Sequence, residues 1–207
     1  TVFLDGTKLE ACANKYTFVW KKSVGKWEEK MFIKIQEAVR LVNQEFIQSF
    51  RVGTEYRVQD LRKICRFLEE ICRERNIEFV HGRGKRKSIE QRYLELFQRY
   101  LERQITYDWH TASFQGRNNY CKTDPDATFM HMKDDHMRNA QLKPGYNVQI
   151  GVDSEYIVAV DIFQDRNDVW SLVPFLKRMK EKLGFNYPSV TADSGYESEE
   201  GYSYLRE

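Results

Sequence analysis

The chain has 207 residues, of which 41% are hydrophobic and 14% aromatic, so it can build a packed core and is not a disordered segment. Its 33 Lys and Arg residues against 31 Asp and Glu residues give a net charge of +2, which by itself indicates no particular partner. No apolar run is long enough to span a bilayer, and the four cysteines form no C-x-x-C pair, so neither a zinc site nor a disulfide framework is indicated.

The N-terminal half predicts one strand followed by three helices. Residues 2–12 begin with extended-favouring apolar residues and predict the first strand. Apolar residues then recur at helical spacing in three segments, which are residues 24–50, 56–75 and 88–106. Ser88 with Gln91 fits a capping box at the start of the third helix. Three amphipathic helices in a row are expected to bury their apolar stripes against one another.

The C-terminal half predicts a sheet with helices. Residues 107–145 show no clear period and are predicted to be mostly loop. Alternating residues from Tyr146 to Phe163 predict a β-hairpin. The remaining elements are a helix over 167–184, a strand ending at Asp193 and a short helix over 197–206. Because crossovers between parallel strands are right-handed, the last strand is expected to return parallel to the first.

These elements predict an α/β fold with two parts. Residues 1–23 and 107–207 are expected to form a mixed-sheet core, and residues 24–106 a helical insertion after the first strand. The chain begins at Thr1 inside a predicted strand and ends at Glu207 inside a predicted helix. Since domains rarely begin and end within an element, we expect the chain to be a piece of a longer protein.

Two aspartates follow apolar residues in the two strands that are expected to be neighbours. Asp5 stands in V-F-L-D-G-T and Asp193 in S-V-T-A-D-S-G-Y, and the glycines predict a turn after each acid. Side by side at the carboxyl ends of their strands, the two acids would lie where open α/β sheets bind ligands. Carboxylate oxygens are preferred ligands of Mg²⁺ and Mn²⁺, and such a site acts on phosphate esters.

Other readings of these residues remain open. D-G-T also occurs in the D-x-D-G-T loop of haloacid-dehalogenase-like phosphatases, but the nucleophile position is Phe3 here, which cannot attack phosphorus. A turn or capping role is the alternative for Asp5. His131 and His136, near two aspartates, suggest a second metal site as an alternative, although their spacing is not typical of metal ligands.

Several motifs together resemble the catalytic core of DDE-type transposases from bacterial insertion sequences. They are D-G-T-K at 5–8, T-D-P-D-A at 123–127, the run 133–153 with Y-N-V-Q-I, D-I-F-Q-D at 161–165 and D-S-G-Y at 193–196. The resemblance covers nearly the whole chain, including the helical block. It implies an RNase H-like fold in which two aspartates and a later glutamate hold two ions, Mg²⁺ or Mn²⁺, that cut and rejoin DNA strands.

The resemblance also implies roles for individual residues. By position, Asp5 matches the first acid and Asp193 the second. The family's glutamate lies on a helix well beyond the second aspartate, and Glu199, Glu200 and Glu207 are too close to Asp193 for that role. The resemblance therefore implies an incomplete site that is inactive alone, from a cytoplasmic, nucleoid-associated bacterial protein that acts as a homo-oligomer on transposon and target DNA.

Two basic segments are candidate DNA contacts. The link H-G-R-G-K-R-K-S at 81–88 runs into a predicted helix N-terminus, where cations and backbone N–H groups suit phosphates. Its cations are Arg83, Lys85, Arg86 and Lys87. Lys8 and Lys15 lie near interleaved aromatic residues that would stack on DNA ends. A simple interhelical loop, and an aromatic core with extended lysines, are the structural alternatives.

The predicted function is therefore that of a DNA transposase core. Two alternatives stay open from the sequence. A metal-dependent nuclease of the same fold would cleave DNA without strand transfer. A non-catalytic DNA-binding or assembly remnant would keep the fold without the chemistry.

Overall fold

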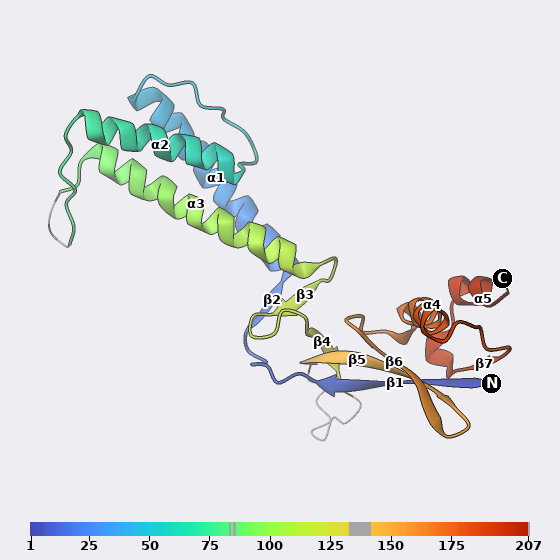
Figure 1. Cartoon of the computed structure of the whole chain (residues 1–207). Helices are drawn as coiled ribbons and strands as arrows, with labels where there is room; N and C mark the ends of the chain where they lie inside the picture. The colour runs from blue at the N-terminus through green and yellow to red at the C-terminus, as the bar shows by residue number, and fades with distance from the viewer. Residues whose placement is uncertain (83, 85, 133–141, 207) are drawn as a thin grey trace. The chain divides into compact units, whose positions relative to one another are not determined.

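A computed structural model describes residues 1–82, 84, 86–132 and 142–206 (Figure 1). The chain forms two compact units, a sheet unit of residues 1–20 and 116–207 and a helical unit of residues 21–115. Each unit has its own cluster of buried apolar side chains. Within the described ranges, no helix combines the length and the apolar character that a membrane span requires.

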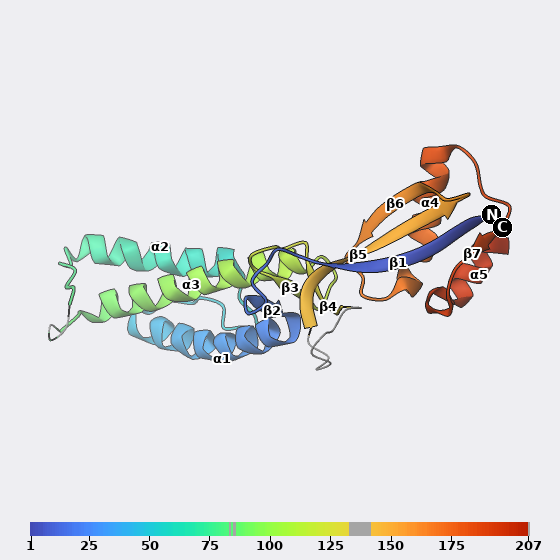
Figure 2. The same cartoon turned by 90° about the horizontal axis from the view of Figure 1, so that it is seen from below.

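The helical unit contains the three helices that the sequence predicts. They are α1 (Lys21–Glu45), α2 (Val58–Glu74) and α3 (Ile89–Phe114), and α2 runs alongside α3 in both views (Figures 1 and 2). Val39, Leu68 and Phe97 are fully buried, one from each helix. The apolar stripes therefore meet in one core, as their helical spacing indicates.

The capping box at the start of α3 is half formed. The Ser88 hydroxyl accepts a hydrogen bond from the Gln91 backbone N–H, as predicted. The Gln91 side chain does not return to the cap, because it is buried and bonds to both backbone groups of Val80 instead. The glutamine thus holds the preceding loop segment against α3.

The sheet unit is built on a mixed sheet. Among the described residues, its strands are β1 (Val2–Glu10), β4 (Thr128–His131), β5 (Leu142–Asp153), β6 (Tyr156–Phe163) and β7 (Val190–Thr191). The order is β4-β5-β1-β7, and β6 also pairs with β5. β5 lies antiparallel to β1 and to β6, whereas β7 is parallel to β1, as the sequence predicts. Short strands β2 (Phe18–Trp20) and β3 (Asn119–Cys121) pair separately.

One face of this sheet is covered by α4 (Leu172–Leu183), which follows the 3₁₀ turn η1 (Asp168–Trp170). Phe175 and Met179 of α4 are buried in the same cluster as Val2 and Leu4 of β1. Gly184 ends the helix in the left-handed conformation at φ 79°, as predicted for a helix stop. The chain then passes through β7 and the 3₁₀ turn η2 (Ser194–Tyr196) to α5 (Glu199–Arg206).

Two sequence predictions about local structure are wrong. Asp5, Gly6 and Thr7 do not form a turn, because β1 continues unbroken from Val2 to Glu10 and pairs with β5 throughout that stretch. Residues 107–145 are not mostly loop, since α3 extends to Phe114 and parts of the sheet follow it. These short strands depend on partners distant in sequence, which local periodicity does not detect. Residues 133–141 lie outside the described residues.

Candidate active site

The parallel pairing of β1 and β7 brings the two predicted acids together. Val2 pairs with Val190 and Phe3 with Thr191, and Asp5 and Asp193 each stand two residues after the last of these pairs, so the pairing brings the two acids into one region of the sheet unit. Neighbouring strands lie about 4.8 Å apart.

Asp5 and Asp193 occupy different local structures. Asp5 stands within β1 and is exposed, while its neighbours Leu4 and Gly6 are buried on the opposite face of the strand. Asp193 is the N-cap of η2, and its Oδ1 accepts a hydrogen bond of 2.9 Å from the Gly195 backbone N–H. One acid is therefore fixed by a strand and the other by a capped turn.

A third carboxylate, Asp168, joins this region. Burial raises the pKa of the Tyr196 phenol, and the negative charges of Asp168, Asp5 and Asp193, in that order, raise it further. All three acids are thus near enough to act on one buried phenol. The sequence did not single out Asp168, which lies in η1 after an irregular segment and belongs to no apolar pattern.

A buried polar network connects Asp168 to Tyr196, and we call it the β5 network. The Asp168 Oδ1 accepts hydrogen bonds from Asn147 Nδ2 at 2.8 Å and from Gln149 Nε2 at 3.0 Å. Gln149 Nε2 also donates to Asn147 Oδ1 at 2.9 Å, and the Tyr196 hydroxyl donates to Gln149 Oε1. Each named polar group in this network has a partner, as buried groups require.

Gly6 leaves the space that this network occupies. Gly6 pairs with Gln149 across the β1–β5 ladder. A Cβ atom at Gly6 would lie 2.6 Å from Gln149 Nε2 and 3.1 Å from both the Asp168 Oδ1 and the Tyr196 hydroxyl. The glycine beside Asp5 is therefore explained by the close approach of the network, and not by the turn that the sequence suggests.

The acids present fit a hard divalent cation. Asp5 and Asp193 offer oxygen ligands, and Mg²⁺ is often held by one or two carboxylates, with waters and substrate phosphates completing its shell. Within the part of the chain that the structure describes, no group of three or more His, Cys, Asp or Glu residues is arranged to hold a metal ion. His131 is described, but His136 lies outside the described residues.

An open cavity of about 350 Å³ borders the turn that carries Asp193. Thr191 and Asp193 line it from the end of β7, and Tyr202 and Leu205 line it from α5. Polar groups of Thr191, Asp193 and Tyr202 and the apolar Leu205 share this lining, so the cavity offers room beside the acid for a group with both polar and apolar parts.

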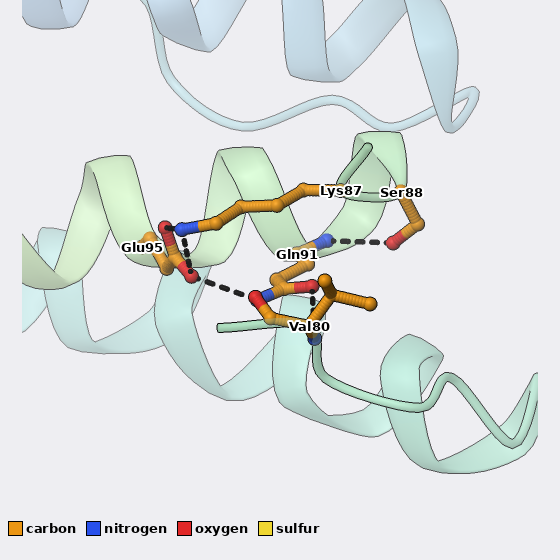
Figure 3. Close-up of polar contacts among 5 residues, drawn as sticks. All are labelled: Val80, Lys87, Ser88, Gln91 and Glu95. Atoms are coloured by element: carbon orange, nitrogen blue, oxygen red, sulfur yellow. Dashed lines mark hydrogen bonds and ion pairs between the residues drawn. The ribbon is translucent and has the colours of Figure 1, made fainter. Parts of the chain in front are cut away.

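The structure describes only part of the predicted basic link at 81–88, and Figure 3 shows its Lys87 and Ser88. Arg83 and Lys85 lie outside the described residues, and Arg86 is exposed. Lys87 forms an ion pair with Glu95, with Nζ 2.6 Å from Oε2, and this contact lowers the pKa of Glu95. Lys87 is therefore less available to a phosphate than an exposed lysine would be.

The second basic segment lies in the sheet unit. Lys8 is half-buried within β1, and the Lys15 Nζ lies 5.2 Å from the ring centroid of the exposed Tyr16. Phe18 packs edge-on against Phe129 at 4.9 Å between ring centroids. The aromatic residues here therefore divide between packing and exposure, with Tyr16 on the surface.

Comparison with known proteins gives one finding for this unit. Residues 117–207 match the family model described as "Transposase DDE domain". The matched segment contains Asp168, Asp193 and the β5 network, but not Asp5. The searches of curated proteins and of solved structures each gave no match. This segment is therefore similar to the DDE domain of transposases.

Proposed function

We propose that the chain is the catalytic core of a DNA transposase that cleaves and transfers DNA strands at the ends of a bacterial insertion sequence. The parallel pairing of β1 with β7, two residues before Asp5 and Asp193, carries this proposal. The family match over residues 117–207 is a separate line of support. It contains Asp193 but not Asp5, so it does not depend on the pairing of β1 with β7. Two acids from opposite ends of the chain then serve one site.

The topology supports an RNase H-like core. β6, β5 and β1 lie consecutively and antiparallel, and β7 returns parallel to β1 after α4. In this proposal the helical unit is an insertion between β1 and the rest of the sheet, close to the predicted range 24–106. The expected setting is a bacterial cytoplasmic protein that acts on nucleoid DNA as a homo-oligomer.

Asp5 and Asp193 would hold Mg²⁺ or Mn²⁺. When bound, such an ion activates water or a DNA 3′-hydroxyl and stabilises the leaving oxygen. The chain's own contribution is to hold two carboxylates in one region of the sheet unit and to leave the cavity beside Asp193 open. Because no third acid completes a metal-binding group among the described residues, we expect the 207 residues alone not to cleave DNA.

Metal binding by the 207-residue chain tests this assignment. Titration with Mn²⁺, followed by electron paramagnetic resonance of the free ion, should give one site that Asp5→Asn or Asp193→Asn weakens at least about tenfold. Asp153→Asn, at the hairpin turn of the same unit, is the matched control and should bind like the wild type. Equal Mn²⁺ affinity in all four proteins would contradict the shared site.

DNA binding by the basic link is a separate expectation. Replacing its four cations at 83, 85, 86 and 87 with alanine should weaken binding to any DNA sequence. Cationic side chains that contact phosphates release the counterions condensed on DNA, and this release favours binding. The salt dependence should flatten by about 0.9 log unit for each lost phosphate contact.

The control for this experiment is a second quadruple alanine variant with the same change in charge. It removes four exposed cations of α2, which are Arg62, Lys63, Arg66 and Arg73. Fluorescence anisotropy with labelled duplex DNA should show a larger loss for the link variant than for the α2 variant. Equal losses would mean that net charge, and not the link, determines DNA binding.

A further inference from the structure

The β5 network joins segments that are far apart in the sequence. Asn147 and Gln149 come from β5, Asp168 from η1 and Tyr196 from η2. Asn147, Gln149 and Tyr196 are 0%, 1% and 3% exposed. Hydrogen bonds among buried groups are directional, and leaving one unmade exposes its partner to the full cost of desolvation. The network therefore favours one arrangement of β5, η1 and η2.

The same bonds lead from one proposed metal ligand to the other. Tyr196 belongs to the turn capped by Asp193, and its backbone N–H donates to the Asp193 carbonyl oxygen at 3.3 Å. Its hydroxyl reaches Gln149, which pairs with Gly6, the residue after Asp5. A short path of contacts thus runs from the Asp193 turn to the segment of β1 that carries Asp5.

The β7 pairing alone is a weak restraint on Asp193. β7 has two residues, Val190 and Thr191, and the strand ends before the acid. Asp193 itself is exposed. A buried anchor three residues further along the chain supplies the restraint that the short strand lacks.

We propose that Gln149, Asp168 and Tyr196 are positioning residues that hold the Asp193 turn in the region of Asp5 and thereby set the metal affinity of the pair. This inference rests on the proposed function for its metal readout. Asp168 acts through its Oδ1, which two amide N–H groups already occupy, and not as a ligand. Outer-shell partners of this kind typically change metal affinity by about 10–100-fold when they are removed.

Tyr196→Phe is the first test, because it removes one buried hydroxyl and keeps the ring. Tyr156→Phe is its matched control, since it makes the same change at a side chain that is 76% exposed in β6 and lies outside the network. Amide hydrogen exchange, resolved by NMR, should be at least tenfold faster for residues 193–197 in Tyr196→Phe. The β1–β5 amides should be unchanged, and Tyr156→Phe should match the wild type at both places.

Asp168 provides the second test, which also covers the case in which Tyr196→Phe does not fold. Asp168→Asn keeps an oxygen that can accept from both amides, whereas Asp168→Ala removes it. Positioning through Oδ1 predicts that the asparagine variant keeps Mn²⁺ affinity within about threefold and that the alanine variant loses at least tenfold. Equal loss in both would overturn the positioning role and indicate that the charge of Asp168 is needed.

The outcomes separate this inference from the proposed function. Faster exchange in the Asp193 turn together with weaker Mn²⁺ binding supports positioning. Unchanged exchange overturns it, as does faster exchange with unchanged Mn²⁺ affinity when Asp5→Asn does weaken binding. If neither Asp5→Asn nor Asp193→Asn changes Mn²⁺ binding, the proposed metal site fails, and hydrogen exchange alone decides whether the network fixes the turn.

Discussion

The two units of this protein differ in how their buried polar groups are arranged. The helical unit has a large apolar cluster and, apart from it, buried polar side chains such as Gln91 and Gln104, and the ion pair between Arg75 and Glu90 lies where α2 ends and α3 begins. The sheet unit combines a small apolar cluster around Leu4 and Phe175 with the buried β5 network. Apolar burial is non-directional, whereas the network fixes donors and acceptors at set distances.

The difference indicates where each unit tolerates change. A core of aliphatic and aromatic side chains accepts substitutions that keep its volume. A buried network does not, because a group left without its partner stays desolvated. The stability of the helical unit should therefore fall mainly when a substitution removes side-chain volume from its core. The stability of the sheet unit should fall when a substitution displaces the hydrogen-bonded groups around Gly6 and Gln149.

The largest expected effect is in the helical core. Phe97 is fully buried, so Phe97→Ala should lower the free energy of unfolding of this unit by about 3–5 kcal/mol through lost transfer energy and a cavity. Thermal unfolding followed by circular dichroism at 222 nm measures it. Ile47→Ala is the control, since Ile47 is 92% exposed, and it should change stability by less than about 0.5 kcal/mol. Similar effects for the two variants would refute the proposed core.

The same substitution should have opposite signs in the two units. Gly6→Ala inserts a Cβ atom 2.6 Å from Gln149 Nε2 and should destabilise the sheet unit by about 1–3 kcal/mol. Gly25→Ala lies in α1 with no atom within 4 Å of the new Cβ, and should stabilise the helical unit by about 0.5–1 kcal/mol through helix propensity. Chemical denaturation of both variants measures the two changes in the free energy of unfolding. A stabilising Gly6→Ala would show that the β5 network rearranges around the new Cβ atom at little cost.

The smallest expected effect is the pH dependence of the Glu90 ion pair. Burial alone would raise the Glu90 pKa, but hydrogen bonds from its own backbone, from Arg75 and from Ser88, together with the Arg75 charge, lower it below its usual value. A lowered folded-state pKa gives stability that is present above the unfolded pKa of about 4.3 and is lost as the pH falls through the folded value.

Glu90→Gln should therefore cost about 0.5–1 kcal/mol at pH 7, a small value because the Arg75 side chain is 55% exposed to solvent. The cost should shrink from pH 7 to pH 3, because the falling pH moves the wild-type carboxylate toward its protonated form. Urea denaturation at the two pH values measures it, with Glu29→Gln on the exposed side of α1 as the control. A cost that does not change with pH would assign Glu90 a packing role.

Much of the fold could be predicted from sequence where neighbours in the chain decide the structure. The stripes of α1, α2 and α3, the Ser88 cap and the Gly184 stop are local signals, and the structure confirms each of them. The β5–β6 hairpin is local too, with a turn at Ser154 and Glu155 in positive φ. The extension of α3 to Phe114 was not predicted, because the polar residue His110 occupies a buried position of its stripe beyond residue 106.

The candidate site was predictable in part. Asp5 and Asp193 stood out because each follows an apolar run, and the parallel return of β7 confirmed the expected pairing of their strands. Asp168 gave no comparable signal, and Gln149 and Tyr196 stood out only as members of the motifs Y-N-V-Q-I and D-S-G-Y that carry the resemblance. Their relationship consists of side-chain contacts between residues 19–47 positions apart, which no spacing rule describes.

The sequence by itself determined the helices of the helical unit, the Ser88 cap and the Gly184 stop, and it proposed the two acids, since periodicity, capping and strand propensity act over a few residues. Only the tertiary structure decided that Gly6 is a packing glycine within a strand, that a third carboxylate approaches the pair, and that a buried network anchors the Asp193 turn. The physical reason is that a buried hydrogen bond requires partners at about 3 Å, and a linear pattern does not state which distant residues the fold brings to that distance.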